Sequence, residues 1–338
     1  MRLRWSGAIG VAITLLLLWW VLHDVSPAEV WRQIRSAHWG WLLAAAGVAT
    51  LTFPIRTIRW RVLLRYEGAP LPWIPLWHAT AIGFMANNLL PARAGEVARA
   101  YAVAQLTGAR FTTAVASIAV ERIFDGVVLL ALLVLGLGAG GFGGQTTIGV
   151  VPVARFTTWA GLVFGGLLVA ALAVIAVPAF TLRVARAATR AALPERWAHR
   201  AVDLFEGLLD GLSALRAPGR LAVVVWWSVV LWVTNGLAFW LAFRAFGLAL
   251  SWGPALVLQG VIAFGVVVPS TPGFFGVFEG ATRAALTLYA VPATTAASLA
   301  IGYHVCGFVP ITLLGLWSLW HANLQLSDLR ARAAGAAS

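Results

Sequence analysis

The chain has 338 residues, of which 61% are hydrophobic and only 11% are charged, and its mean hydropathy of +0.86 excludes an ordinary soluble globular domain. All 24 basic residues are arginine, so the net charge of +12 arises without lysine, which excludes a Walker A nucleotide loop and Schiff-base chemistry. A single cysteine, Cys306, excludes a disulfide within the chain and a cysteine-rich metal site.

Apolar stretches long enough to cross a hydrocarbon core of roughly 30 Å predict an all-α polytopic membrane protein. Six full transmembrane helices are expected, near residues 6–23, 38–55, 112–137, 156–179, 220–247 and 293–320. No small-residue cleavage site follows the basic start of the chain, so the first stretch is expected to be a retained helix. Two further apolar stretches, 73–90 and 254–290, are interrupted by proline, glycine and asparagine.

The arginines indicate how the two interrupted stretches are placed. If 73–90 crossed the membrane, the arginine-rich segments 56–65 and 181–219 would lie on opposite sides, against the positive-inside rule. A re-entrant helical hairpin over 73–108 instead places both segments and both termini in the cytoplasm. The same reasoning makes 254–290 a second hairpin, entered from outside. The sequence therefore predicts two opposed re-entrant hairpins.

We expect a single integral membrane domain over residues 1–338, with two halves related by an inverted internal repeat. The first half covers 1–180, and an amphipathic cytoplasmic connector covers 181–219. The second half covers 220–325, and a short basic tail covers 326–338. LPARAGE at 90–96 and PSTPGFFGVFE at 269–279 are both broken by proline and glycine and both end in glutamate. Chance recurrence of proline and glycine in membrane helices is the alternative explanation.

Two arginine-rich segments are expected at the membrane surface. In 181–219, apolar residues at helical spacing predict a helix lying on the cytoplasmic interface, with a solvated connector helix as the alternative. In 56–65, RTIRWRVLLR, arginine and tryptophan stand directly beside a span, which favours contact with lipid headgroups. No nucleic-acid partner is expected, because the basic residues lie beside apolar spans.

Ionisable residues within the apolar stretches indicate a binding site. Each costs on the order of 2.5 to 3.5 kcal/mol at the membrane centre, so these groups should pair or line a wet cavity. Arg93 and Glu96 are three apart, as are Arg122 and Asp125, with Glu121 adjacent. Arg122 alone cannot neutralise both carboxylates that flank it. Protonation, Arg93 or a cationic ligand group would have to compensate. A purely structural salt-bridge cluster is the alternative.

The hairpin tips should expose helix N-termini, where an arginine would complete a phosphate site. Asn87 and Asn88 can satisfy the opened backbone or donate to a headgroup. His304 is interpreted either as a proton relay or as a hydrogen bond between helices. Close helix packing is expected at Gly273, Gly276 and Gly280.

The stretches NNLLPARAGE, ERIFD and PSTPGFFGVFE together resemble the flippase-like integral membrane family typified by the transmembrane domain of lysylphosphatidylglycerol synthase, over about residues 10 to 320. The resemblance implies a lipid moved between leaflets, with its head handled by the charged hairpins. Because the sequence ends at residue 338 without an aminoacyl-transferase domain, synthase activity is not expected. With Asn88 and His304, the substrate-binding candidates are Asn87, Pro91, Arg93, Gly95, Glu96, Glu121, Arg122, Asp125, Pro272, Gly273 and Glu279.

The sequence thus predicts a bacterial inner-membrane flippase for an anionic or zwitterionic lipid, such as a phospholipid, a polyprenyl-linked glycolipid or a hopanoid. It is expected to be no enzyme, to need no cofactor or metal, and to contact membrane lipids; no oligomeric state is indicated. A second hypothesis is a scaffold that recruits a lipid-modifying enzyme through 181–219. An intramembrane hydrolase is disfavoured, because no nucleophile stands with a base and no HExxH spacing occurs.

Overall fold

The computed structural model describes residues 2–66, 69–90, 94–139, 177–192, 218–268 and 270–329, together with residues 147, 148, 151, 152, 155, 158, 159, 161, 162, 166, 194 and 202. Helices make up nearly all of this part of the chain. Two antiparallel pairs of two-residue strands complete it: β1 (Arg65–Tyr66) with β2 (Ala69–Pro70), and β3 (Thr147–Ile148) with β4 (Val151–Pro152). The all-α prediction is confirmed for the described residues.

The long helices are α1 (Arg2–Leu22), α3 (Trp39–Leu63), α6 (Phe111–Ala139), α10 (Pro218–Ala245) and α13 (Ala293–His321). The shorter ones are α2 (Pro27–Ser36), α4 (Trp73–Leu89), α5 (Gly95–Thr107), α8 (Pro178–Ala192), α11 (Trp252–Gly265), the 3-10 turn η1 (Pro272–Phe274) and α12 (Val277–Thr287).

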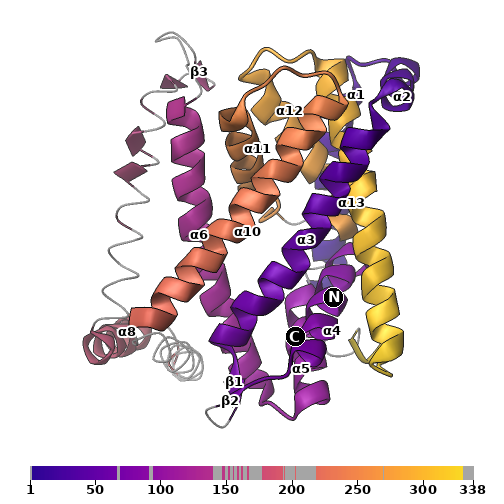
Figure 1. Cartoon of the computed structure of the whole chain (residues 1–338). Helices are drawn as coiled ribbons and strands as arrows, with labels where there is room; N and C mark the ends of the chain where they lie inside the picture. Colours follow the sequence, from indigo (N-terminus) through magenta and orange to yellow (C-terminus); the bar gives the residue numbers. More distant parts are fainter. Residues whose placement is uncertain are drawn as a thin grey trace.

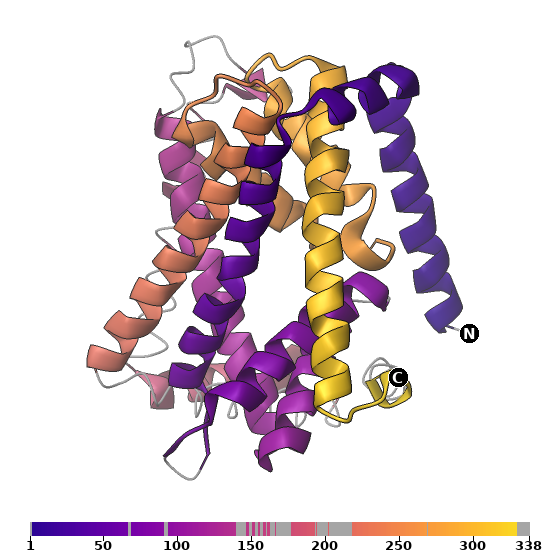
Figure 2. The same ribbon diagram turned by 45° about the vertical axis from the view of Figure 1, so that its right-hand side comes forward.

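Two helical hairpins extend into the molecule from opposite ends. Figure 1 shows α4 and α5 together at the lower end, near β1 and β2, and α11 and α12 together at the upper end. The view in Figure 2 shows the same separation. The long helix α3 runs from the upper end to the lower one beside α10, which runs the other way. The hairpin tips therefore approach the middle of the molecule from opposite sides.

Three described helices are long and apolar enough to cross a membrane: Trp39–Leu63, Gly219–Ala245 and Ala293–His321. A fourth span results if the pair Gly10–Leu22 and Pro27–Ser36, bent by 79°, is counted as one. The expected span at 156–179 lies almost wholly outside the described residues. The protein is thus an integral membrane protein with three or four candidate spans in its described part, and six spans remain a prediction.

Several of the exposed tryptophans lie near the two ends of the helix bundle. Trp31 lies on α2, and Trp39 and Trp41 lie at the start of α3, all at the upper end. Trp317 and Trp320 lie at the lower end of α13. The exposed large side chains between these ends include Leu15, Leu16, Leu43, Leu51 and Leu313. Aromatic residues flanking an aliphatic zone are typical of the two interfaces of a bilayer.

Glycines allow each hairpin to pack closely on a long helix. A Cβ atom added to Gly315 of α13 would lie 2.7 Å from the carbonyl oxygen of Ala81 on α4. One added to Gly136 of α6 would lie 2.8 Å from the carbonyl oxygen of Gly253 on α11. Because these positions lack a Cβ, backbones approach more closely than larger residues would permit.

The structure places the arginines of the two arginine-rich segments differently. In the described part of 181–219, α8 lies at the lower end with Arg183 and Arg186 exposed and Leu182 packed against the core. The prediction for 56–65 is wrong for Arg56 and Arg59. The helix α3 continues to Leu63, so both side chains are buried inside the bundle rather than placed at the lipid surface.

Candidate functional site

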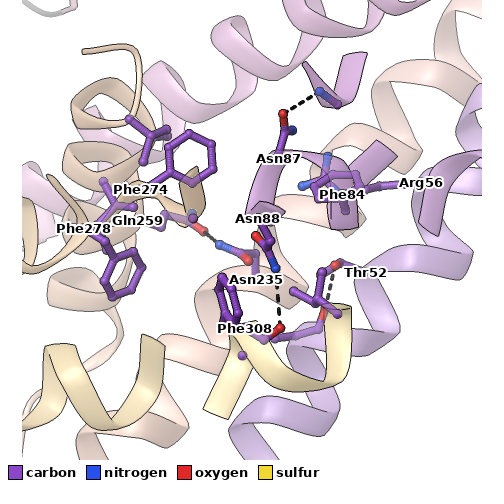
Figure 3. A pocket seen from close by; sticks show the side chains of 18 of the residues that line it. Thr52, Arg56, Phe84, Asn87, Asn88, Asn235, Gln259, Phe274, Phe278 and Phe308 are labelled. Carbon is purple, nitrogen blue, oxygen red and sulfur yellow. Dashed lines mark hydrogen bonds between the residues drawn. The ribbon is translucent and has the colours of Figure 1, made fainter. Parts of the chain in front are cut away.

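A cavity of about 330 Å³ lies in the middle of the bundle, where the two hairpin tips meet the long helices. The first hairpin contributes Asn87, Asn88, Gly95, Glu96 and Arg99 to its wall. The second hairpin contributes Gln259, Ile262, Gly273, Phe274 and Phe278, and Figure 3 shows several of these side chains around the opening. Both hairpins therefore build one cavity.

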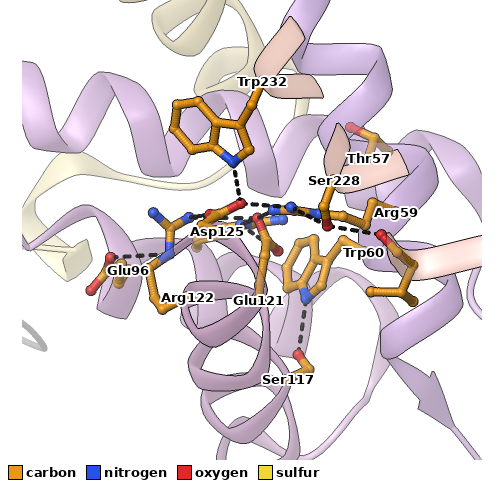
Figure 4. A network of polar contacts seen from close by, with 12 residues as sticks. Thr57, Arg59, Trp60, Glu96, Ser117, Glu121, Arg122, Asp125, Ser228 and Trp232 are labelled. Carbon is orange, nitrogen blue, oxygen red and sulfur yellow. Dashed lines mark hydrogen bonds and ion pairs between the residues drawn. The ribbon is translucent and has the colours of Figure 1, made fainter. Parts of the chain in front are cut away.

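Arg59 on α3 is the centre of a charged cluster on one side of this cavity, which we define as Arg59, Glu96, Arg99, Glu121, Arg122 and Asp125. Figure 4 labels all of them except Arg99. The Arg59 guanidinium is fully buried, with Nη1 at 2.6 Å from Asp125 Oδ1 and Nη2 at 2.8 Å from Glu121 Oε1. Nη1 also donates to Ser228 Oγ on α10 at 2.9 Å. One arginine thus joins α3 to α6 and α10.

Arg99 on α5 completes the neutralisation of Glu121. Its Nη1 lies 3.1 Å from Glu121 Oε2, and its guanidinium carbon lies 3.8 Å from the centre of the Trp60 ring. Trp60 is fixed in turn by an N–H donated to Ser117 Oγ at 2.9 Å. Arg122 Nη2 also lies 3.5 Å from Glu121 Oε1, so Glu121 is completely buried among three arginines and joins the hairpin to α3 and α6.

Arg122 and Glu96 form the open edge of the charged cluster. Their side chains are 39% and 42% exposed, and Arg122 Nε lies 3.7 Å from Glu96 Oε1. Arg122 Nη2 also lies 3.3 Å from Asp125 Oδ2. Arg122 and Glu96 are thus the exposed members of the charged cluster, whereas the side chains of Arg59 and Glu121 are fully buried.

The wall formed by the second hairpin and α13 is largely apolar. Its apolar members include Phe274, Phe278, Phe308, Ile262 and Val266, and the polar Gln259 and His304 lie among them. The cavity therefore has one charged wall and one largely apolar wall.

The tip of the second hairpin is fixed by Glu279. Its Oε2 accepts the N–H of Gly276 at 2.6 Å, and its Oε1 lies 2.6 Å from His304 Nδ1 on α13. Gly276 has a φ of 80°, and a Cβ there would lie 2.7 Å from the carbonyl oxygen of Thr14 on α1. The hydrogen bond between helices proposed for His304 is present, joining α12 to α13.

The tip of the first hairpin is fixed in a similar way. Asn87 Oδ1 accepts the N–H of Gly95 at 2.9 Å, and Asn88 Nδ2 donates to Thr312 Oγ1 on α13 at 2.9 Å. A Cβ on Gly95 would collide with the carbonyl oxygen of Gly83. Asn87 thus satisfies the opened backbone, as predicted, and the first amide of α5 is not free for an anion.

Comparison with known proteins identifies the family to which this architecture belongs. Residues 7–315 match the family described as the lysylphosphatidylglycerol synthase TM region. The chain belongs to this family.

Two relatives show how far the likeness extends. Glycosyltransferase AglD of Haloferax volcanii is 30% identical over 351 residues, which cover 94% of this chain and 54% of that protein. The chain thus spans about half the length of this relative. A UPF0104 membrane protein of Methanothermobacter thermautotrophicus is 23% identical over 340 residues, which cover 96% of this chain and 95% of that protein. The resemblance inferred from the motifs is confirmed at the level of the family.

The structure gathers most of the candidates predicted from the sequence into one place. Those that line the cavity are Asn87, Asn88, Gly95, Glu96, Arg122, Asp125, Gly273 and His304. Three others, Glu121, Pro272 and Glu279, are absent from its described lining. Pro91 and Arg93 lie outside the described residues, so their roles remain predictions.

Several residues of the site are not among the candidates predicted from the sequence. They are Arg56, Arg59, Arg99, Trp232, Asn235 and Gln259. The unbalanced charge of Glu121 and Asp125 was the available signal, because it required further cations nearby. Arg59 is 66 residues from Asp125, and spacing along the chain gives no indication of that pairing.

Proposed function

We propose that this protein moves an anionic or zwitterionic lipid between the leaflets of a membrane. The observation that carries the proposal is the single cavity with a charged wall and an apolar wall, contributed by both hairpins. A lipid head would lie against the charged cluster while its chains stay against Phe274, Phe278 and Phe308 or in the surrounding bilayer. The family description supports a membrane role and leaves the cargo open.

The proposed membrane arrangement has six spans, with the two hairpins re-entrant from opposite faces and both termini on the arginine-rich side. In support, α3 and α6 flank the lower hairpin and α10 and α13 flank the upper one. Each hairpin also packs on a long helix of the other half, α4 on α13 and α11 on α6. Such reciprocal packing is expected of an inverted repeat. A bacterial inner membrane remains our proposed location.

In this proposal Arg122 and Glu96 contact the lipid head, and the pairs around Arg59 keep the wall rigid. Arg93 is proposed to join them from the hairpin tip. Without a lysine there is no Walker A loop, so transport would be facilitative or coupled to an ion gradient.

The test is lipid movement in vesicles reconstituted with the full chain. A fluorescent phospholipid present in both leaflets is exposed to a quencher that reaches only the outer one. The parent should make inner-leaflet lipid accessible, and Arg122→Ala and Glu96→Ala should slow this about tenfold or more, because each removes a charged hydrogen-bonding group. Arg244→Ala, exposed on α10 away from the cavity, is the matched control.

The outcomes separate two claims. A parent protein that moves no lipid contradicts the proposed function. A parent that moves lipid while both cavity variants match it contradicts the assignment of the site.

One observation favours a second candidate, a scaffold for a lipid-modifying enzyme. In Glycosyltransferase AglD the segment that matches this chain is only about half of the protein. In that protein, a region related to this chain is joined to further sequence, and the whole protein is named a glycosyltransferase. Deletion of 181–219 should remove a bound enzyme if this chain is a scaffold, and should leave lipid movement in vesicles intact if it is a transporter.

A further inference from the structure

Arg56 is a buried cation in the wall of the central cavity. It lies on α3 one turn before Arg59, and only 6% of it is exposed. Its guanidinium carbon lies 4.9 Å from the centre of the Phe84 ring and 5.3 Å from that of Trp232. Figure 3 shows Arg56 lying against Phe84 at the edge of the opening. Aromatic faces on two sides stabilise a guanidinium but do not neutralise it.

Arg56 differs from the neighbouring arginines in its partners. Arg59, Arg99 and Arg122 each have a carboxylate oxygen within 4 Å. For Arg56 no ion pair occurs among the described residues, and its buried Nε and Nη1 atoms have no hydrogen-bond partner there.

The buried carboxylate of the cavity wall, Asp125, is already occupied by other partners. Asp125 Oδ1 accepts hydrogen bonds from Arg59 and from Trp232 Nε1 at 2.6 and 2.9 Å, and its Oδ2 lies 3.3 Å from Arg122. Four guanidinium groups, those of Arg56, Arg59, Arg99 and Arg122, thus lie in and behind the cavity wall on α3, α5 and α6. The carboxylates there are the three of Glu96, Glu121 and Asp125.

An unpaired charge held away from water is unfavourable, and removing the partner of a buried ion strongly destabilises a fold. A binding site can tolerate such a charge when a ligand supplies the opposite one. Guanidinium groups bind phosphate especially well, because their paired N–H donors match its oxygens. The largely apolar wall of the second hairpin and α13 suits the acyl or polyprenyl chain attached to such a phosphate.

We propose that Arg56 is the anchor for a phosphate group of the lipid, so that the cargo is a phosphate-bearing lipid rather than an uncharged one. This inference rests on the proposed function, because it concerns the same cavity. It selects phospholipids and polyprenyl phosphates over hopanoids and other lipids without phosphate.

The test measures lipid binding by native mass spectrometry and by thermal unfolding, on the full chain in a nonionic detergent that contains no phosphate. The probes are dioctanoyl phosphatidylglycerol, dioctanoylglycerol and inorganic phosphate. The parent should bind one phosphatidylglycerol and unfold at a higher temperature in its presence. Arg56→Gln should bind it about tenfold more weakly or worse, and Arg56→Lys should fall between them. Arg244→Gln is the control on an exposed arginine.

Thermal unfolding without lipid distinguishes a binding role from a structural one. Since Arg56→Gln removes an unpaired buried charge, this variant should unfold at the same temperature as the parent or higher. A clear drop would mean that Arg56 holds the fold together, and would overturn the proposal.

Three further results would also overturn it. They are equal binding of phosphatidylglycerol by the parent and by Arg56→Gln, equal binding of dioctanoylglycerol and phosphatidylglycerol by the parent, and binding of inorganic phosphate as tight as that of the lipid. The vesicle assay keeps the two claims apart. Arg56-dependent binding without lipid movement would contradict transport alone, and lipid movement with Arg56-independent binding would contradict the anchor alone.

Discussion

At the scale of single residues, the site depends on how charge is balanced inside the bundle. Glu121 and Asp125 lie one helical turn apart on α6. The sequence offered Arg122 to neutralise them, with protonation, Arg93 or a cationic ligand group to compensate for the rest. The structure supplies Arg59 from α3 and Arg99 from α5. Because these residues are distant in sequence, their pairing follows from the packing of helices and could not be read from spacing.

Arg59→Ala should destabilise the protein by about 3 to 5 kcal/mol, because it leaves two buried carboxylates without their shared partner. Unfolding of the purified protein in sodium dodecyl sulfate measures the change. Arg32→Ala is the matched control, since it removes the exposed Arg32–Glu29 pair on α2 and should have no measurable effect. Equal stability of the two variants would show that the charged cluster does not hold the bundle together.

Arg283 on α12 ties the second hairpin to the end of α1. It donates to the carbonyl oxygens of Trp20 and Val21 at 2.7 Å and to both oxygens of Asp24. The hydrogen bond from Arg283 holds the pKa of the Asp24 carboxyl below its ordinary value. A lowered pKa means that the contact stabilises the fold fully above the ordinary pKa of about 4 and is lost as the pH falls through the lowered one.

The unfolding temperature of the parent should therefore exceed that of Asp24→Asn at neutral pH, and the difference should shrink in acid, below a pH of about 4. Taking the difference at each pH removes the contribution of other carboxyl groups, such as Glu29. A difference that stays constant from neutral to strongly acidic pH would mean that Asp24 acts without its charge.

At the scale of elements, the sequence predicted most helices closely. The expected spans 112–137 and 293–320 correspond to Phe111–Ala139 and Ala293–His321, because long apolar runs define their own limits. For the span expected at 38–55, the predicted end lies eight residues before the observed end of α3 at Leu63. The helix α3 continues through Pro54 to Leu63, and Arg59 in this continuation forms ion pairs with Glu121 and Asp125 inside the bundle.

The first hairpin depends on the contact between Gly83 on α4 and Gly95 on α5. Gly95→Ala should destabilise the protein by about 1 to 3 kcal/mol, because the added Cβ collides with the Gly83 carbonyl oxygen and forces the helices apart. Gly126→Ala on α6 meets no atom within 4 Å and should be neutral or stabilising by up to about 1 kcal/mol. Unfolding of both variants under one condition tests this, and a Gly95→Ala variant as stable as the parent would contradict the close packing.

At the scale of the whole molecule, the account depends on two hairpins that enter the bundle from opposite ends and meet at one cavity. The distribution of arginine along the sequence predicts that the two hairpins enter from opposite sides. It could not predict which side chains meet at the tips, because Asn88 with Thr312, and Glu279 with His304, are brought together only by the packing of each hairpin on α13.

Cysteine labelling in sealed, oriented membrane vesicles tests this arrangement most directly. In a Cys306→Ser background, one cysteine replaces Arg110, in the connection between α5 and α6, and another replaces Ala249, in the connection between α10 and α11. A membrane-impermeant maleimide should label Arg110→Cys only from the cytoplasmic side and Ala249→Cys only from the opposite side. Labelling of both positions from one side would contradict the opposed hairpins and the transport path built on them.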